Sequence, residues 1–124
     1  MWTATLIITE YNNKKVCLDG QEFDSRKEAK RYAELQLLLR AGEIKDLDRQ
    51  VRIELIPAQY VDDPTKPKGK RCVELAVNYV ADFVYTDNRT GEKVIEDTKG
   101  FKTKDYIIKR KLARYIKGID IKEV

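Results

Sequence analysis

The stretch Asn78–Gly100, NYVADFVYTDNRTGEKVIEDTKG, decides the fold that the sequence predicts. A strand predicted over Val73–Tyr85 runs into it and is rich in Val, Tyr, Ala and Phe. A short second strand is predicted over Lys93–Lys99. The residues between them, Asp87–Gly91, are dense in turn formers. We therefore expect a β-hairpin around which the rest of the chain is organised.

Side chains alternate between the two faces of a strand, which places the acidic residues of the hairpin. Asp82 is predicted to share a face with Val80 and Val84, and the opposite face carries Tyr79, Ala81, Phe83 and Tyr85. In the second strand Asp97 shares a face with Ile95 and Lys99, and the opposite face carries Val94, Glu96 and Thr98. Both faces are mostly apolar, so we expect both strands to be buried on two sides.

Asp82 and Asp97 thus sit among hydrophobic neighbours, where a carboxylate is costly unless a positive charge compensates it. Lys99 follows two residues after Asp97. Mg²⁺ prefers hard oxygen ligands, often one or two carboxylates with waters and a phosphate oxygen. The pattern indicates a divalent cation, with Lys99 holding or deprotonating a water or steadying charge on phosphate. A buried Asp–Lys ion pair, or solvated strand ends, would explain the same residues.

Length and composition favour one small domain. The chain has 124 residues, of which 42% are hydrophobic and 37% charged, as in ordinary soluble proteins. No apolar run approaches the roughly 18 residues of a membrane span, and Met1–Thr9 lacks the features of a signal peptide. We expect a cytoplasmic protein with residues 1–23 as an N-terminal β extension and 24–124 as the core.

The sequence contains no histidine, which excludes histidine-based general base catalysis, Ser-His-Asp hydrolysis and Cys-His zinc sites. Any hydrolytic chemistry must then use carboxylates, lysine and a metal. Cys17 and Cys72 lie far apart inside predicted strands. We interpret them as buried free thiols of a reducing compartment rather than as a disulfide or metal site.

The net charge of +4 is unevenly distributed. Lys99–Val124 carries nine Lys and Arg residues against three Asp and Glu residues, which favours a polyanionic partner, although a solvated helix face would show the same pattern. The segment Val61–Arg71 holds two prolines and a glycine among charges, which predicts a loop or hairpin tip. Its basic residues could track phosphates or simply be solvated: Lys66, Lys68, Lys70 and Arg71.

Two helices are predicted from their end signals. Asp24-Ser25 opens the first, Ser25–Glu28 fits a capping box, and Gly42 ends the helix. Glu28 therefore has a capping role available, and a site role requires that it point toward the sheet. The second helix is predicted over Lys104–Lys117, with Thr103 as its cap and Gly118 at its end.

The remaining segments are predicted as strands: an edge strand or arm in Thr3–Thr9, a hairpin over Val16–Phe23 that turns at Asp19-Gly20, a long strand from Ile44 onward, and a short final strand over Ile119–Val124. The core order is therefore helix, three strands, helix, strand. A helical crossover between the third and fourth of these strands implies that they lie parallel. We expect an α/β (α+β) fold with a mixed sheet flanked by helices.

This order resembles the PD-(D/E)XK nuclease superfamily, and more narrowly a family of small phage and prophage proteins within it. The similarity covers Phe23–Ile119. It rests on four sequence segments that occur in the same order as in that family: FDSRKEAKRY (Phe23–Tyr32), AGEIKDLDRQ (Ala41–Gln50), YVADFVY (Tyr79–Tyr85) and EDTKGFKT (Glu96–Thr103). The resemblance implies a restriction-endonuclease-like αβββαβ core and metal-dependent cleavage of DNA phosphodiesters. It also implies a phage or prophage origin in a bacterial cell.

Carried over by position, Asp82 and Asp97 would be ligands of Mg²⁺ or Mn²⁺, and Lys99 the catalytic lysine. Glu28 matches the acid of the first helix and would complete the outer ligand shell. Gln50 stands where the family repeats a glutamine, as a possible supporting residue. Ala81 replaces the proline of the superfamily name, a position that carries no chemistry. Glu96 is on the wrong face to replace Asp97 as a ligand.

The implied partner is DNA. Lys102, Lys104, Lys109 and Lys111 would neutralise phosphates along the approach to the site. No residue pattern reads base edges, so structure-directed cutting of branched DNA is expected rather than sequence reading. A homodimer would supply two active sites for two strands. The alternative from another class is a phage accessory protein that binds DNA with this fold but does not cut it.

Overall fold

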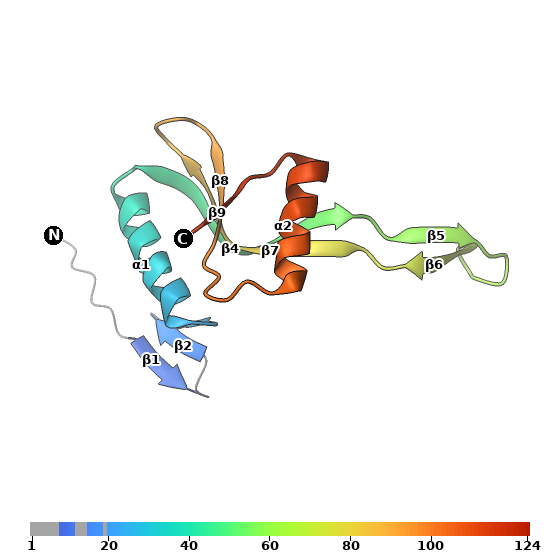
Figure 1. The fold of residues 1–124 in the computed structure, drawn as a ribbon, viewed down its shortest axis with the longest axis horizontal. Helices are drawn as coiled ribbons and strands as arrows, with labels where there is room; N and C mark the ends of the chain where they lie inside the picture. Colours follow the sequence, from blue (N-terminus) through green and yellow to red (C-terminus); the bar gives the residue numbers. More distant parts are fainter. Residues whose placement is uncertain (1–7, 12–14, 19) are drawn as a thin grey trace.

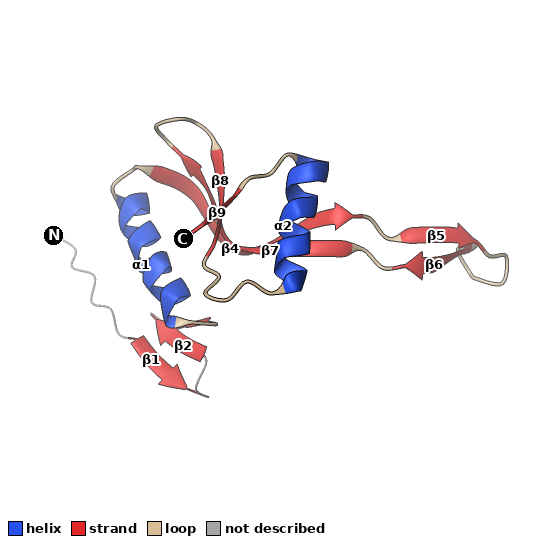
Figure 2. Cartoon of the chain, viewed as in Figure 1, coloured by secondary structure: helices blue, strands red, loops and turns tan. Residues whose placement is uncertain are grey.

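A four-stranded sheet with one helix against each face forms the core of the structure. The computed structural model describes residues 8–11, 15–18 and 20–124. Within them the chain forms two helices and nine strands, shown in Figure 2. In chain order these are β1 (Ile8–Tyr11), β2 (Lys15–Leu18), β3 (Gln21–Phe23), α1 (Arg26–Arg40), β4 (Ile44–Ile56), β5 (Gln59–Asp62), β6 (Lys70–Glu74), β7 (Val77–Asp87), β8 (Lys93–Asp97), α2 (Lys104–Lys117) and β9 (Ile121–Glu123).

The central sheet is mixed, as predicted. Its strand order is β4-β7-β8-β9. The β4–β7 and β7–β8 pairs are antiparallel, and β9 returns parallel to β8 after the crossover through α2. The predicted order of helix, three strands, helix and strand is therefore confirmed for the core, with the β5–β6 pair inserted between the first two of these strands.

Both helices begin and end where the sequence signals place them. The Ser25 side chain accepts a hydrogen bond from the Glu28 amide at the start of α1. Thr103 does the same for the Tyr106 amide at the start of α2. Gly118 ends α2 in the left-handed conformation, with φ of 66°, which glycine adopts without a Cβ penalty.

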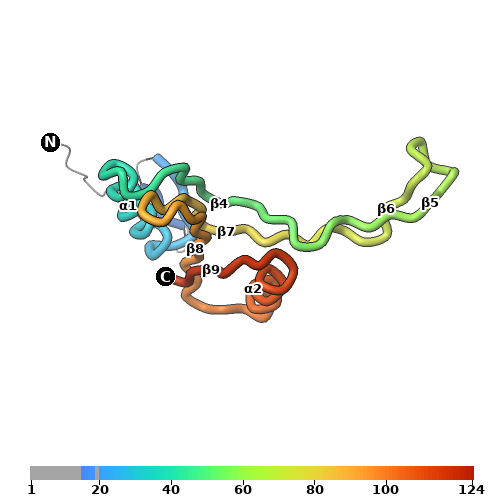
Figure 3. Tube along the Cα trace, turned by 90° about the horizontal axis from the view of Figure 1, so that it is seen from above, coloured from blue at the N-terminus to red at the C-terminus, as the bar shows by residue number. Residues whose placement is uncertain are grey.

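The two helices cover opposite faces of the sheet. Leu35 of α1 packs in a cluster with Ile44, Phe83 and Tyr85. On the other face Tyr106 and Ala113 of α2 pack in a cluster that also contains Leu55, Tyr79, Ala81, Val84 and Ile95. Burial of β7 on both sides, over Ala81–Tyr85, agrees with the prediction. The two helices lie apart on either side of the strands in Figure 3.

One detail of the predicted hairpin is wrong. Strict alternation placed Tyr79 and Ala81 opposite Val84, yet these three residues share one cluster. The change of side coincides with Gln50 of β4, which has a positive φ of 50° and lies across from Asp82 by the register of the neighbouring pairs. The alternation therefore changes where the partner strand has an irregular backbone conformation.

The N-terminal extension is a three-stranded antiparallel sheet, β1-β2-β3, rather than a hairpin alone. The predicted hairpin over Val16–Phe23 is present as β2 and β3, although Asp19 lies outside the described residues. The edge strand expected in Thr3–Thr9 is seen only as β1, because residues 1–7 also lie outside them. Val16, Leu18 and Phe23 pack against Ala29 of α1, which ties the extension to the core.

The segment predicted as a loop or hairpin tip forms a paired arm. β5 and β6 are antiparallel and joined by the turn 63–69, and the arm projects from the body beyond β4 and β7 (Figure 1). The predicted strand Val73–Tyr85 is therefore two strands, because β6 ends at Glu74 and β7 begins at Val77. Cys72 is exposed on this arm and Cys17 is half-buried on β2, so the expectation of two buried thiols is wrong.

No helix in the described part of the chain is long and apolar enough to cross a bilayer.

Candidate functional site

Asp82 and Asp97 come together on the paired strands β7 and β8. The β7–β8 register pairs Phe83 with Glu96 and Val84 with Ile95, so Asp82 and Asp97 lie across from one another at the next position. Directly opposed residues of an antiparallel pair point to the same face. Both carboxylates are buried, with 8% of Asp82 and none of Asp97 exposed.

Thr98 holds the Asp82 carboxylate in place. Its backbone N–H and its hydroxyl both donate to Asp82 Oδ2, at 2.9 and 2.7 Å. The other oxygen, Oδ1, accepts only a longer hydrogen bond of 3.3 Å from Gln50 Nε2 among the described residues. Asp82 therefore keeps one well-fixed oxygen and one weakly engaged oxygen.

Asp97 shows the same asymmetry more strongly. The Tyr79 hydroxyl donates to Asp97 Oδ2. None of the described residues donates a hydrogen bond to Asp97 Oδ1, although this atom is buried. Lys99 Nζ lies 3.6 Å from it as the nearest positive charge. A buried acceptor that lacks a donor costs free energy, so this oxygen is a candidate ligand atom.

Glu28 approaches the two aspartates from α1, and Gln50 links it to them. Gln50 Nε2 donates to Glu28 Oε1 at 2.7 Å as well as to Asp82 Oδ1. Glu28 also accepts a hydrogen bond from the Asp24 amide at 3.4 Å. It therefore contributes both to capping of α1 and to the site. The positive φ of Gln50 is uncommon for a residue with a side chain, and such strain is found at functional sites.

Burial raises the pKa values of Glu28 and Asp97, which favours the binding of a proton or a cation. It raises the pKa of Glu28 to about 7, and the negative charge of Asp82 acts in the same direction. Burial likewise raises the pKa of Asp97 to about 6, and Asp82 again adds to the rise, while the Tyr79 hydroxyl and Lys99 oppose it. Such carboxyl groups take up a proton or a cation readily.

Glu96 occupies the opposite face, as predicted, and has a structural role there. Arg31 forms a bidentate pair with it, with Nε and Nη2 at 2.8 and 2.7 Å from its two oxygens. The Tyr85 hydroxyl also donates to Glu96. Although burial acts the other way, these hydrogen bonds lower the pKa of Glu96 below its usual range. Its oxygens are thus satisfied within the protein.

The donor atoms at the site fit a hard divalent cation. Asp82 Oδ1 and Asp97 Oδ1 are the two carboxylate oxygens with least hydrogen bonding, and both belong to the ligand type that Mg²⁺ and Mn²⁺ prefer. Within the described residues no three Asp, Glu or Cys side chains form a ready-made metal cluster. The protein would therefore supply two carboxylates and leave the other positions to water or substrate oxygens.

The lysines predicted to bind DNA do not form one surface. Lys109 and Lys99 line the same hollow beside the acids, whereas Lys111 lines a different one. Lys104 is exposed at the start of α2, and Lys102 is paired with Glu123 at 3.3 Å. Lys68 and Lys70 lie on the β5–β6 arm, away from the acids, as Figure 1 shows.

Several residues at the site were missed by sequence reasoning. Tyr79 donates a hydrogen bond to Asp97, and Thr98 donates to Asp82. The sequence feature that could have identified them is a hydroxyl group in a buried strand, because such a group needs a hydrogen-bond partner. Lys27 and Lys30 of α1 line a second basic hollow together with Thr98. Thr98 and Lys99 are neighbours in sequence and line different hollows, so positive charge flanks the acids on two sides.

The fold and the site define an α+β domain with a mixed sheet that carries two buried, unevenly satisfied carboxylates beside a lysine. The chain belongs to the family described as "Protein of unknown function (DUF1064)", whose model matches residues 8–122. The match takes in every site residue named above. No curated protein and no solved structure gives a significant match to the chain.

Proposed function

We propose that this protein is a metal-dependent DNA endonuclease of the PD-(D/E)XK type. The observation that carries the proposal is the buried Asp97 Oδ1, which finds no hydrogen-bond donor in the described structure and lies 3.6 Å from Lys99 Nζ, with Asp82 on the adjacent strand. Two carboxylates and a lysine in this arrangement are what the resemblance to that superfamily requires. The αβββαβ order of the core supports the same assignment as a restriction-endonuclease-like domain.

Asp82 and Asp97 would hold Mg²⁺ or Mn²⁺ through their Oδ1 atoms. When bound, the ion supplies Lewis-acid polarisation of a phosphodiester and a more acidic water. Thr98 and Tyr79 fix the other oxygens of the two carboxylates, so both are preorganised before substrate arrives. Glu28 does not touch the aspartates directly in the structure, and it supports them through the Gln50 amide.

Lys99 contributes a positive charge next to the acids. Its ammonium group is only partly exposed and pairs with Asp97, which positions it to hold an attacking water or to steady the charge that develops on phosphate. Lys109 on one flank and Lys27 and Lys30 on the other would neutralise neighbouring phosphates. We place the protein in the cytoplasm of a bacterial cell, as a phage or prophage product, and expect a homodimer when both strands are cut.

Cleavage assays test this proposal. The wild-type protein is incubated with Mg²⁺ or Mn²⁺ and a panel of linear, flapped and four-way DNAs, beside Asp82→Asn and Lys99→Ala. Lys45→Ala, which removes an exposed lysine of β4, is the matched control. We expect cleavage by the wild type and the control, and a loss of at least about 100-fold in both site variants, as for removal of a charge-stabilising group.

DNA binding without metal-dependent cleavage of any substrate would overturn the proposal and favour the non-cleaving accessory protein. Circular dichroism spectra that match the wild type would show that the inactive variants are folded. Cleavage that persists in Asp82→Asn would place the chemistry elsewhere in the protein.

A further inference from the structure

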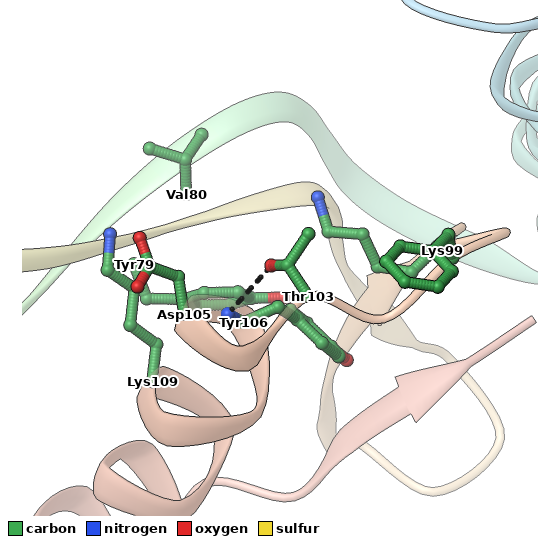
Figure 4. A pocket seen from close by; sticks show the side chains of 8 residues that line it. Tyr79, Val80, Lys99, Thr103, Asp105, Tyr106 and Lys109 are labelled. Carbon is green, nitrogen blue, oxygen red and sulfur yellow. Dashed lines mark hydrogen bonds between the residues drawn. The ribbon is translucent and has the colours of Figure 1, made fainter.

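A hollow of about 340 Å³ adjoins the acidic residues, and the proposed chemistry uses only its two lysines, Lys99 and Lys109. Its volume lies at the lower end of the range for small-ligand sites, roughly 300–1,000 Å³. Figure 4 shows Lys99 reaching in from the segment after β8 and Lys109 from α2, on either side of Tyr79 and Tyr106 and below Val80. Phe101 completes the apolar part of the lining.

The hollow is joined to the acids through two of its own lining residues. The Tyr79 hydroxyl donates to Asp97 Oδ2, and Lys99 Nζ lies 3.6 Å from Asp97 Oδ1. Lys99 Nζ also lies 5.6 Å from the centroid of the Tyr106 ring. A group bound in the hollow is therefore next to any phosphate held at the acids.

Phe101 is the unexplained member of this lining. It follows Lys99 by two residues, and 83% of its surface is exposed. Val80 in the same hollow is 40% exposed. The lining also holds one carboxylate, Asp105, against the two lysines. An aromatic ring and an aliphatic side chain exposed together beside two lysines combine the features that bind nucleotides: aromatic rings stack on bases, and ammonium groups pair with phosphates.

We propose that this hollow takes one unpaired nucleotide of the DNA substrate, with its base stacked on Phe101 and its phosphate between Lys99 and Lys109. The proposal rests on the proposed nuclease function and adds its substrate class: DNA that presents an unpaired or splayed nucleotide next to the cut. In this assignment the hollow takes a single base with its sugar. A paired base must first leave its stack at a cost in free energy, whereas an unpaired base does not bear this cost.

Binding measurements with a fluorescent base test the pocket separately from catalysis. The full chain carries Asp82→Asn to prevent cutting and is titrated into flapped DNA with 2-aminopurine as the unpaired nucleotide at the branch. The same strand fully paired is the comparison. We expect quenching of 2-aminopurine by stacking in the flapped DNA only, and roughly tenfold weaker binding of that DNA when Phe101→Ala is added, in line with the loss of one base–aromatic stack.

Two further variants control for general effects. Phe101→Trp keeps an aromatic ring and should retain the affinity for flapped DNA. Tyr115→Ala removes an aromatic side chain that is 90% exposed on α2 outside this hollow, and it should change neither affinity nor quenching. Equal affinity for paired and flapped DNA, or no loss with Phe101→Ala, would overturn the pocket assignment.

Cleavage assays with Asp82 intact distinguish this failure from that of the nuclease proposal. Cleavage that does not depend on Phe101 would reject the nucleotide pocket and leave the nuclease proposal standing. Phe101-dependent binding of flapped DNA without any metal-dependent cleavage would reject the nuclease and keep the pocket.

Discussion

Replacing Asp97 with asparagine should stabilise the metal-free protein at neutral and alkaline pH, although it removes a proposed metal ligand. Asp97 is fully buried, one of its oxygens receives no hydrogen bond from the described residues, and Asp82 lies across from it. Its negative charge is therefore unfavourable until a cation binds. The asparagine side chain is neutral, and its carbonyl oxygen can still accept the hydrogen bond from the Tyr79 hydroxyl.

The magnitude follows from the pKa of Asp97. Burial raises this pKa from the ordinary value of 3.8 to about 6, so the folded state binds the proton more tightly than the unfolded state. The contribution of Asp97 to wild-type stability should then fall as the pH rises from 3.8 to 6, and stay level above that. Each tenfold change in proton affinity corresponds to about 1.36 kcal/mol, so the full effect is about 3 kcal/mol.

Thermal unfolding of both proteins in EDTA at about pH 4.5 and about pH 8 measures this effect. At about 4 °C per kcal/mol for a domain of this size, Asp97→Asn should unfold on the order of 10 °C higher at the alkaline pH and only about 4 °C higher at the acidic pH, where about a third of the effect is present. Asp48→Asn, at an exposed position of β4, controls for general charge effects. A destabilised variant, or a gain of equal size at both pH values, would refute the account of Asp97 as a buried charge that is unfavourable without a cation.

Three other changes test separate parts of the structure. Arg31→Ala leaves Glu96 buried without its bidentate partner, so we expect a loss of about 3–5 kcal/mol in the free energy of unfolding by urea, and little loss if Glu96→Gln is made as well. This pair should weaken as the pH falls below about 4.5, because the pKa of Glu96 is lowered in the folded state. The stability difference between the wild type and the Arg31→Ala, Glu96→Gln double variant should therefore shrink on acidification, and a difference that grows would contradict the account of the pair. Gln50→Ala removes the amide between Glu28 and Asp82 and should lower metal affinity by about tenfold in calorimetric titrations, with unchanged affinity counting against a supporting role. Lys109→Ala should reduce the slope of log K against log salt for DNA binding by about one, whereas Lys102→Ala, whose lysine is paired with Glu123, should change it less.

The sequence predicted those elements whose signals are local. Cap residues Ser25 and Thr103 and the terminal Gly118 defined both helices correctly, because capping depends on residues within one turn. The parallel return of β9 followed from the crossover through α2. The arm formed by β5 and β6 was predicted only as a loop or hairpin tip, with Val73 and Glu74 in the following strand, because all of its strand residues are exposed and show no pattern of apolar alternation.

The candidate site was predictable only in part, for reasons that are also physical. Asp82, Asp97 and Lys99 stand out because charges inside apolar strands are costly, and the structure brings them together. The positive φ of Gln50 and its bridge to Glu28 join residues far apart in the chain, and no local pattern encodes that geometry.

The β5–β6 arm has a consequence for how this protein can vary. The arm enters and leaves the core between Ile56 and Val77, which are paired neighbours at the end of the β4–β7 ladder. An isolated two-stranded hairpin is only marginally stable in water, and the arm has no third strand among the described residues. A tight turn could therefore replace it without disturbing the sheet that holds the acids. The length of the β5–β6 arm is therefore independent of the core sheet. Residues can be inserted or deleted in the arm while the carboxylates keep their positions.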